Sequence, residues 1–200
     1  MSRLPAEKRR EQLLDCAADL FARSGYARAT TAELARAAGV TEPIIYRHFN
    51  SKRDLFIALV ERTAKQTLTH WEQRLADASD PAERLRRVIG DNPMVSPEGA
   101  GPYRVLLQAI TEVSDPEIQK AIAGHFRKLH EFLTREIKRA QDEKKVRHVF
   151  APELIAWTLI HVGLGYGVLT ALGVQGSDDD PTGQHVQRML ERILVGKHED

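Results

Sequence analysis

The sequence has a single cysteine, Cys16, so the chain cannot form a disulfide framework of its own. It has no charged N-terminal stretch followed by an apolar segment, the pattern of a secretory leader, and we therefore expect a cytoplasmic protein. No segment alternates between apolar and polar residues as a strand does, and no repeat of 20 to 50 residues occurs. These absences favour an all-helical protein.

Signatures of enzymes and metal sites are also missing. The Gly163-x-Gly165-x-Gly167 spacing lies inside an apolar helical run and follows no strand, so it favours close helix packing over a phosphate loop. His125 and His130 are five residues apart, which does not place them on one helical face as metal ligands require. No Ser, His and Asp set is discernible. We therefore expect no catalytic residue, no metal and no cofactor.

What the sequence does contain is a helix-turn-helix between residues 30 and 53. Thr30 followed by Glu33 is a capping box, which predicts the start of a helix. Gly39 predicts its end, because glycine accepts the left-handed backbone that closes a helix. Thr41 is expected to cap the next helix, whose first turn tolerates Pro43. Two short helices joined by a glycine turn make a helix-turn-helix.

The side chains of this motif divide into a packing set and a polar set. Ala35 must be small where the second helix crosses the first, and Ile45 must be apolar because it faces the three-helix core. A further capping box, Ser51 with Asp54, predicts a third helix directly after the motif. The opposite face of the second helix is polar where such a helix presents its N-terminal half to the major groove of DNA. The polar residues are Thr41, Glu42, Tyr46, Arg47 and His48.

These residues resemble the tetracycline-repressor (TetR) family of bacterial transcription regulators. The resemblance rests on ATTAELARAAGVTEPIIYRHFNSKRDLF, preceded by LLDCAADLFARSGYARAT, and covers roughly residues 8 to 60. We expect a DNA-binding domain over residues 1–50 and a helical ligand-binding and dimerisation domain over residues 51–200. Contacts with DNA phosphates are expected from Thr31, Tyr46, His48 and Lys52, and contacts with base edges from Thr41, Glu42, Pro43, Ile44 and Arg47.

Charge is unevenly spread along the chain, although the total is only +1. Residues 1–55 carry ten Lys or Arg against seven Asp or Glu, a net charge of +3, whereas the remainder has a net charge of −2. This mild basic bias fits nucleic-acid binding without proving it. Lys8, Arg9 and Arg10, near the start of the first helix, either contact the DNA backbone or form a solvated face.

Turn and capping signals divide the rest of the chain into further helices, for a total of about nine. The residues from Gly90 to Pro102 and from Gly176 to Gly183 are rich in Gly, Pro and Asp and predict loops, the first of which is a plausible gate. The expected helices run from Ser51 toward Asp77, from Asp80-Pro81, over Tyr103–Val113, from Asp115-Pro116, from Pro152 to Gly173, and over His185–Val195.

The stretch from Leu154 to Val174 carries no formal charge over about the length that spans a membrane. Its glycines and polar residues dilute the hydropathy, and a helix that is apolar all round can instead be buried between protein surfaces. We therefore expect no membrane partner but a homodimer, in which this helix and the last one pair with a symmetry mate. The expected interface residues are Gly163, Gly167, Val186, Met189, Leu190 and Ile193.

The resemblance further implies that the helical body, residues 51–200, binds a small molecule. Its apolar helices favour an apolar or amphipathic effector. Candidate ligand contacts are Tyr103, Leu107, Phe126, Leu129, His130, Leu133, Trp157, His161 and Tyr166, each of which could equally be a core residue. The hypothesis is a ligand-responsive regulator of operator DNA, a repressor that its effector releases. Two alternatives stay open: a helical small-molecule-binding enzyme with a vestigial head, and a constitutive DNA-binding protein without an effector.

Overall fold

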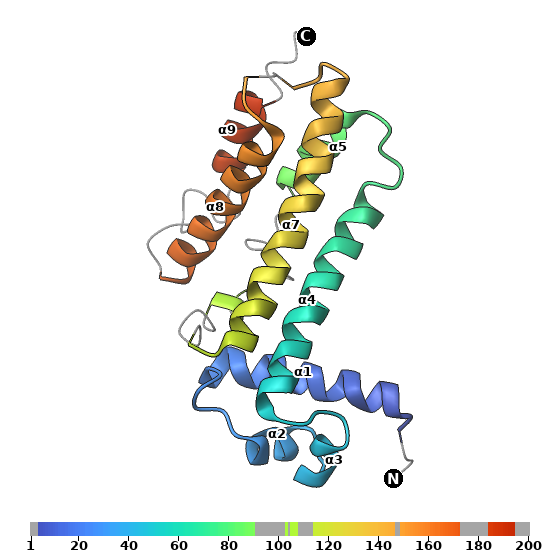
Figure 1. Ribbon diagram of the computed structural model, residues 1–200, viewed down its shortest axis with the longest axis vertical. Coiled ribbons are helices and arrows are strands. Elements are labelled where there is room, and N and C mark those ends of the chain that lie inside the picture. The colour runs from blue at the N-terminus through green and yellow to red at the C-terminus, as the bar shows by residue number, and fades with distance from the viewer. Residues whose placement is uncertain are drawn as a thin grey trace. The chain divides into compact units, whose positions relative to one another are not determined.

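The expected all-α fold is confirmed by a computed structural model of the chain (Figure 1). The structure describes residues 4–90, 103, 105–107, 114–146, 149–172 and 184–194. Over these residues the backbone forms eight helices with defined bounds and no strand, and residues 103 and 105–107 are also helical. The helices are α1 (Ala6–Ser24), α2 (Thr31–Ala37), α3 (Glu42–Tyr46), α4 (Lys52–Arg74), α5 (Pro81–Gly90), α7 (Pro116–Asp142), α8 (Pro152–Ala171) and α9 (Gln184–Leu194).

The chain divides into two compact units. The first consists of Met1–Ala64 and Gly101–His125, and the second of Lys65–Ala100 and Phe126–Asp200. Helices α4 and α7 each contribute residues to both units. This division follows compactness, so the functional boundary expected between residues 50 and 51 stays a prediction.

Local signals in the sequence set most helix ends. The Thr30 hydroxyl accepts a hydrogen bond from the Glu33 amide at 3.2 Å, and the Glu33 carboxylate accepts one from the Thr30 amide at 2.9 Å. Gly39 has a φ of 64°, the left-handed conformation that the turn requires. Proline occupies the first position of α5, α7 and α8, where its missing N–H costs no intrahelical bond.

The helix after the motif starts with a modified version of the expected capping box. The Ser51 hydroxyl accepts a hydrogen bond from the Asp54 amide at 3.0 Å, as predicted. The Asp54 carboxylate, however, accepts its bond from the Asn50 amide at 2.9 Å, one residue earlier than in the usual box. Thr41 also holds the N-cap position of α3, although its side chain forms no capping hydrogen bond.

The core of the first unit is formed by one face of α1 and the start of α4. The helical spacing of five apolar residues in α1 places them on one face, and all five are buried: Leu13, Leu14, Ala17, Leu20 and Phe21. The rings of Phe21, Tyr26 and Phe56 form an aromatic cluster with centroid separations between 4.7 and 5.7 Å. Such pairs add about 0.5–1.5 kcal/mol each beyond area burial. This cluster packs α1 and the turn after it against α4.

In the second unit, one part-buried ion pair and one aromatic stack link three helices. The Arg84 guanidinium forms a two-pronged pair with the Glu136 carboxylate, with nitrogen–oxygen distances of 2.7 and 2.9 Å. Another nitrogen of Arg84 donates to the Leu75 carbonyl at 2.7 Å. Trp71 of α4 stacks on Phe132 of α7, with centroids 5.2 Å apart. These contacts join the end of α4, α5 and α7.

Several helix and loop boundaries differ from the expected ones or lie outside the described residues. Helix α4 ends at Arg74, three residues before Asp77, and α8 ends at Ala171. The loop expected from Gly90 to Pro102 lies outside the described residues except for Gly90, which is the last residue of α5. The loop expected from Gly176 to Gly183 lies wholly outside them.

Candidate nucleic-acid interface

The helix-turn-helix is assembled as its spacing predicts. Ala35 on α2 and Ile45 on α3 are both buried, so the two helices cross at a small residue and α3 turns an apolar side chain to the core. Val40 donates its amide to the Ala35 carbonyl at 2.9 Å, which closes α2 over the Gly39 turn. The result is a packed pair of short helices with one exposed face.

The residues expected to face base edges lie on that free face to different degrees. Thr41, Pro43 and Arg47 are exposed, whereas Glu42 and Ile44 are half-buried. Arg47 follows the last residue of α3, and its charged side chain is open to solvent. An exposed arginine at the end of this short helix has the reach and the donors that guanine recognition in the major groove requires.

A hydrogen-bonded group joins the starts of α2 and α3. The Thr31 hydroxyl donates to the Glu42 carboxylate at 2.8 Å and lies 3.3 Å from the Tyr46 hydroxyl. Three of the residues predicted to touch DNA are therefore brought together, from two helices. Because Tyr46 remains 49% exposed, its hydroxyl stays accessible from outside the protein.

Lys52, expected to hold a phosphate, is engaged inside the protein. Its ammonium group donates to the carbonyls of Tyr26, Ala27 and Ala29 at 3.0, 3.3 and 3.0 Å. The same nitrogen lies 4.5 Å from the centroid of the Tyr26 ring. An ammonium has three donors, so all of them serve the connection between α1 and α2. The phosphate contact stays a prediction and would compete with at least one of these bonds.

The expected effector residues fall into buried and surface groups. Tyr103, in the first unit, is buried and its hydroxyl lies 3.0 Å from the His125 imidazole, while Leu107 is half-buried. In the second unit Leu129, Leu133 and Tyr166 are buried and Phe126 is half-buried. Among the described residues no group of three or more His, Cys, Asp or Glu side chains is placed to hold a metal ion.

The other three effector candidates form a stack at the surface. The His130 ring lies 4.5 Å from the Trp157 ring, which lies 6.0 Å from the His161 ring, and both pairs are close to parallel. The His130 imidazole is also 3.0 Å from the Glu153 carbonyl. Trp157 is 40% exposed and His161 is exposed, so this side of α8 faces outward within its unit.

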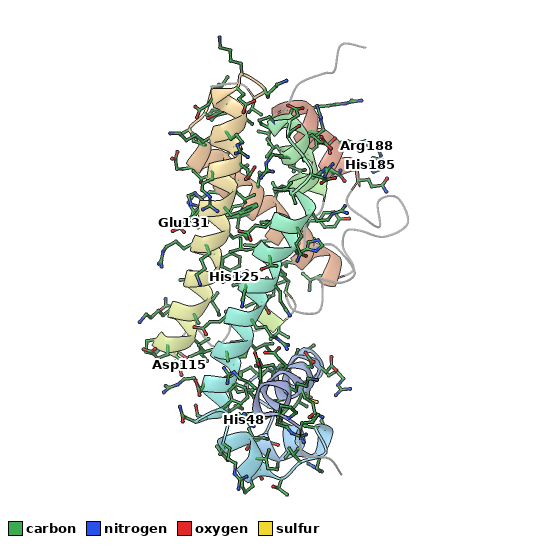
Figure 2. The ribbon with its side chains drawn as sticks, turned by 90° about the vertical axis from the view of Figure 1, so that its right-hand side faces the viewer. His48, Asp115, His125, Glu131, His185 and Arg188 are labelled. Atoms are coloured by element: carbon green, nitrogen blue, oxygen red, sulfur yellow. The ribbon has the colours of Figure 1, made fainter. Side chains whose placement is uncertain are left out.

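Helices α8 and α9 carry the apolar surface that the sequence assigns to a dimer. Met189 and Ile193 of α9 are 51% and 61% exposed, and Val186 and Leu190 on the same face are half-buried (Figure 2 shows α9 beside its labelled residues His185 and Arg188). Gly163 is buried within the unit and Gly167 is half-buried. One described stretch, Pro152–Leu169, is long and apolar enough to cross a membrane, a test that the core helix of a soluble protein also passes.

Comparisons with known proteins agree with this geometry. The sequence model for "Bacterial regulatory proteins, tetR family" matches residues 13–59, which include α2, α3 and the first turns of α4. The chain is 38% identical over 88 residues to the HTH-type transcriptional activator FasR of Mycolicibacterium smegmatis, which covers 44% of this chain and only 40% of FasR. It is 30% identical over 148 residues to the nucleoid occlusion factor SlmA of Marinobacter nauticus, covering 74% of both chains.

The chain belongs to the tetR family. It is a DNA-binding transcriptional regulator with an N-terminal helix-turn-helix head and a helical C-terminal part. A transcriptional regulator from Saccharomonospora viridis, crystallised with choline, has the same fold, with a TM-score of 0.84 over 96% of this chain at 23% identity. AibR, crystallised with isovaleryl coenzyme A and operator DNA, shares it with a TM-score of 0.73 over 94% of this chain at 19% identity.

The sequence did not indicate three contacts in this tetR-family head. It gave no sign that Thr31 bonds Glu42, that Lys52 reaches three carbonyls, or that Arg10 of α1 touches the end of α3. Each pair is separated by 11 to 38 residues. No helical spacing or motif marks such contacts, so only the folded head could reveal them.

Proposed function

We propose that this protein is a homodimeric repressor of transcription that a small apolar or amphipathic effector releases from its operator. The observation that supports DNA readout most directly is the free polar face of α3, with Thr41, Pro43 and Arg47 exposed beside a helix-turn-helix packed through Ala35 and Ile45. Because a regulator of this kind acts on chromosomal DNA, we place it in the cytoplasm, with double-stranded DNA as its partner and without a membrane.

A dimer would bring two such heads to one operator. Two α3 helices must lie roughly 34–36 Å apart, one turn of DNA, to enter successive major grooves. The exposed apolar faces of α8 and α9 supply a surface that a second copy could cover in a two-fold arrangement. We assign Trp157 and His161, which are exposed on α8, to this surface rather than to an effector cavity.

The effector proposal rests on the body and on the fold's other members. The Saccharomonospora viridis regulator was crystallised with choline, a cationic ligand, and FadR of Bacillus subtilis with stearoyl-CoA, an amphipathic one. These proteins share only the fold with this chain, so they support ligand binding by such a body without naming the ligand. The buried residues Leu129, Leu133 and Tyr166 favour contact with an apolar portion of the effector.

Release requires that the effector binds the DNA-free conformation better than the DNA-bound one, since equal binding shifts no equilibrium. Helices α4 and α7 each contribute to both compact units, and α4 directly follows the helix-turn-helix, which makes it the natural carrier of this coupling. Widening the separation of the two heads by a few ångström would remove both α3 helices from their grooves at once.

The test is an anisotropy titration of operator DNA with and without effector, after the operator has been selected from randomised duplexes. Leu129→Trp and Phe126→Trp should fill space in the body and block the response, while operator affinity changes by less than about threefold, below 1 kcal/mol. Mutants that respond normally would place the effector elsewhere. A wild-type protein that selects no duplex would contradict sequence-specific DNA binding altogether.

A second candidate is DNA binding that no effector controls. It is favoured by the similarity to SlmA, a nucleoid occlusion factor, which in the Marinobacter nauticus protein extends over 74% of this chain. This candidate predicts that operator affinity stays constant across a panel of choline, acyl-CoA and fatty-acid ligands.

A further inference from the structure

We propose that Arg10 of α1 is a positioning residue that sets the orientation of α3 in the DNA groove. This inference rests on the proposed DNA-reading role of α3 and concerns a residue that contacts neither base nor phosphate in it. One guanidinium nitrogen of Arg10 donates to the His48 carbonyl at 3.0 Å (Figure 2 labels His48 just past α3). The guanidinium carbon lies 4.3 Å from the centroid of the Phe49 ring.

The end of α3 needs such an anchor because the helix is very short. Its five residues are fewer than an isolated helix requires for stability in water. The amides of His48 and Phe49 both donate to the Ile45 carbonyl, at 2.9 and 3.0 Å, so these two residues continue the last turn. A positive group at this end also complements the partial negative charge of the helix C-terminus.

Arg10 contacts this turn in two ways. The carbonyl bond fixes the distance between α1 and the His48 backbone, and the flat guanidinium rests on the face of Phe49, which is only 2% exposed. A planar group that stacks and donates at once fixes an angle as well as a distance, which a lysine ammonium does less well. Arg47 and Tyr46, just before this turn, are the residues whose pose depends on that angle.

The same part of α1 also anchors α2. Gln12, two residues further along, donates to the Ala38 carbonyl at 3.3 Å, directly after the last residue of α2. The Arg9 guanidinium in turn donates to the Gln12 side-chain oxygen at 2.6 Å, which leaves the Gln12 amide turned toward α2. The ends of both helices of the motif are therefore held by one stretch of α1, residues 10–12.

The experiment compares Arg10→Met, Arg10→Lys and Arg23→Met with the wild-type protein on two fluorescent duplexes. One is the duplex that the wild-type protein selects from a random pool, and the other is a scrambled duplex of the same length. Arg23 lies on the same helix, is exposed, and provides the matched loss of one positive charge. Affinities are measured over a range of KCl concentrations, and melting curves verify that each variant is folded at the assay temperature.

Arg10→Met should weaken binding to the selected duplex about tenfold, the scale of one lost base contact. Its affinity for the scrambled duplex and the slope of affinity against salt should match those of the Arg23→Met control. Arg10→Lys keeps the charge and can still donate to the His48 carbonyl, but it loses the planar group over Phe49, so it should recover the specific affinity only in part. A merely structural role would lower the melting temperature without changing the ratio of selected to scrambled binding.

Two results would overturn the proposal. A parallel loss on both duplexes with a salt slope reduced by about 0.9 per protomer would make Arg10 a phosphate contact. An unchanged ratio in Arg10→Met would show that α3 holds its pose without it. If Arg10→Met does not fold, Phe49→Leu removes the stacking face and keeps the carbonyl bond, and an unchanged ratio in that variant would overturn the proposal equally. Failure of the wild-type protein to select any duplex would instead refute the proposed function.

Discussion

The hydroxyl of Thr31 donates a 2.8 Å hydrogen bond to the carboxylate of Glu42, and this bond connects the first turn of α2 to the first turn of α3. Both residues were expected to touch DNA directly. The bond leaves the second carboxylate oxygen of Glu42 available as an acceptor, which is the group that recognises the amino group of cytosine. Thr31 therefore holds in place a side chain that could read sequence.

Removing the Thr31 hydroxyl should loosen that side chain without disturbing the helices. We expect Thr31→Val, which keeps the branched shape, to lower operator affinity by about 0.5–1.5 kcal/mol, the net value of one hydrogen bond. Thr31→Ser, which restores the hydroxyl, should bind like the wild-type protein. Equal affinities of Thr31→Val and Thr31→Ser, measured by anisotropy, would exclude a role for this bond in DNA binding.

Arg47 should carry sequence discrimination. Its side chain is exposed at the end of α3, and Arg47→Ala should cost about 1–3 kcal/mol of operator affinity and relax base preference at one position of each half-site. Selecting duplexes from a random pool with the mutant protein identifies the position at which base preference is lost. A uniform loss over all sequences would instead assign Arg47 to the phosphate backbone.

Lys52→Ala separates the two roles considered for this residue. As a phosphate contact, Lys52 should contribute to binding of every sequence, and its loss should flatten the salt slope by about one unit per protomer. As an anchor of the turn at Tyr26, Ala27 and Ala29, it should stabilise the head by about 1.5–3 kcal/mol, the scale of hydrogen bonds from charged groups. Denaturant unfolding and the salt titration measure the two effects independently, and we expect the loss of stability.

Dimer formation should depend on the exposed face of α9. Ile193→Asp and Met189→Asp place a charge on side chains that are more than half exposed in one protomer, so folding should survive while association is lost. Val149→Asp, at a 69% exposed position outside α9, is the matched control.

The glycines of α8 test the same interface in another way. The substitutions Gly163→Leu and Gly167→Leu should also disrupt the dimer, by overpacking that costs about 1–3 kcal/mol. Because Gly163 is buried within its own unit, its mutant tests the core as well as the interface. A wild-type monomer in sedimentation at micromolar concentration would refute the dimer.

The capping box at the start of α2 should make part of the stability dependent on acid. Hydrogen bonds from the Thr30 hydroxyl and amide hold the pKa of Glu33 below its ordinary value of 4.5. Because this pKa is lower in the folded protein than in the unfolded chain, the carboxylate stabilises the fold above the ordinary value and loses that effect as the pH falls through the folded value. Unfolding curves should show that the difference in unfolding free energy between the wild-type protein and Thr30→Ala becomes smaller below pH 4.5. A gap independent of pH would mean that the carboxylate does not contribute.

Much of the fold could be read from the sequence because its signals are local. The Thr30 and Glu33 box, the left-handed Gly39 and the prolines at the starts of α5, α7 and α8 each act over four residues or fewer. The apolar stripe of α1 follows from helical spacing alone. Such features depend on backbone geometry and on the nearest turns, so they hold before any tertiary contact forms.

Tertiary structure alone decided how the charged and aromatic side chains are used. Composition counts Arg10 and Lys52 among the positive charges available to DNA, but folding brings carbonyls 23 to 38 residues away within hydrogen-bond distance of them. Trp157 has the character of a core residue in sequence, yet it is exposed and stacked on His130. Hydrogen bonds and ring stacking act over a few ångström, so the partner of a long side chain is set by which helices meet, and this depends on the packing of the whole chain.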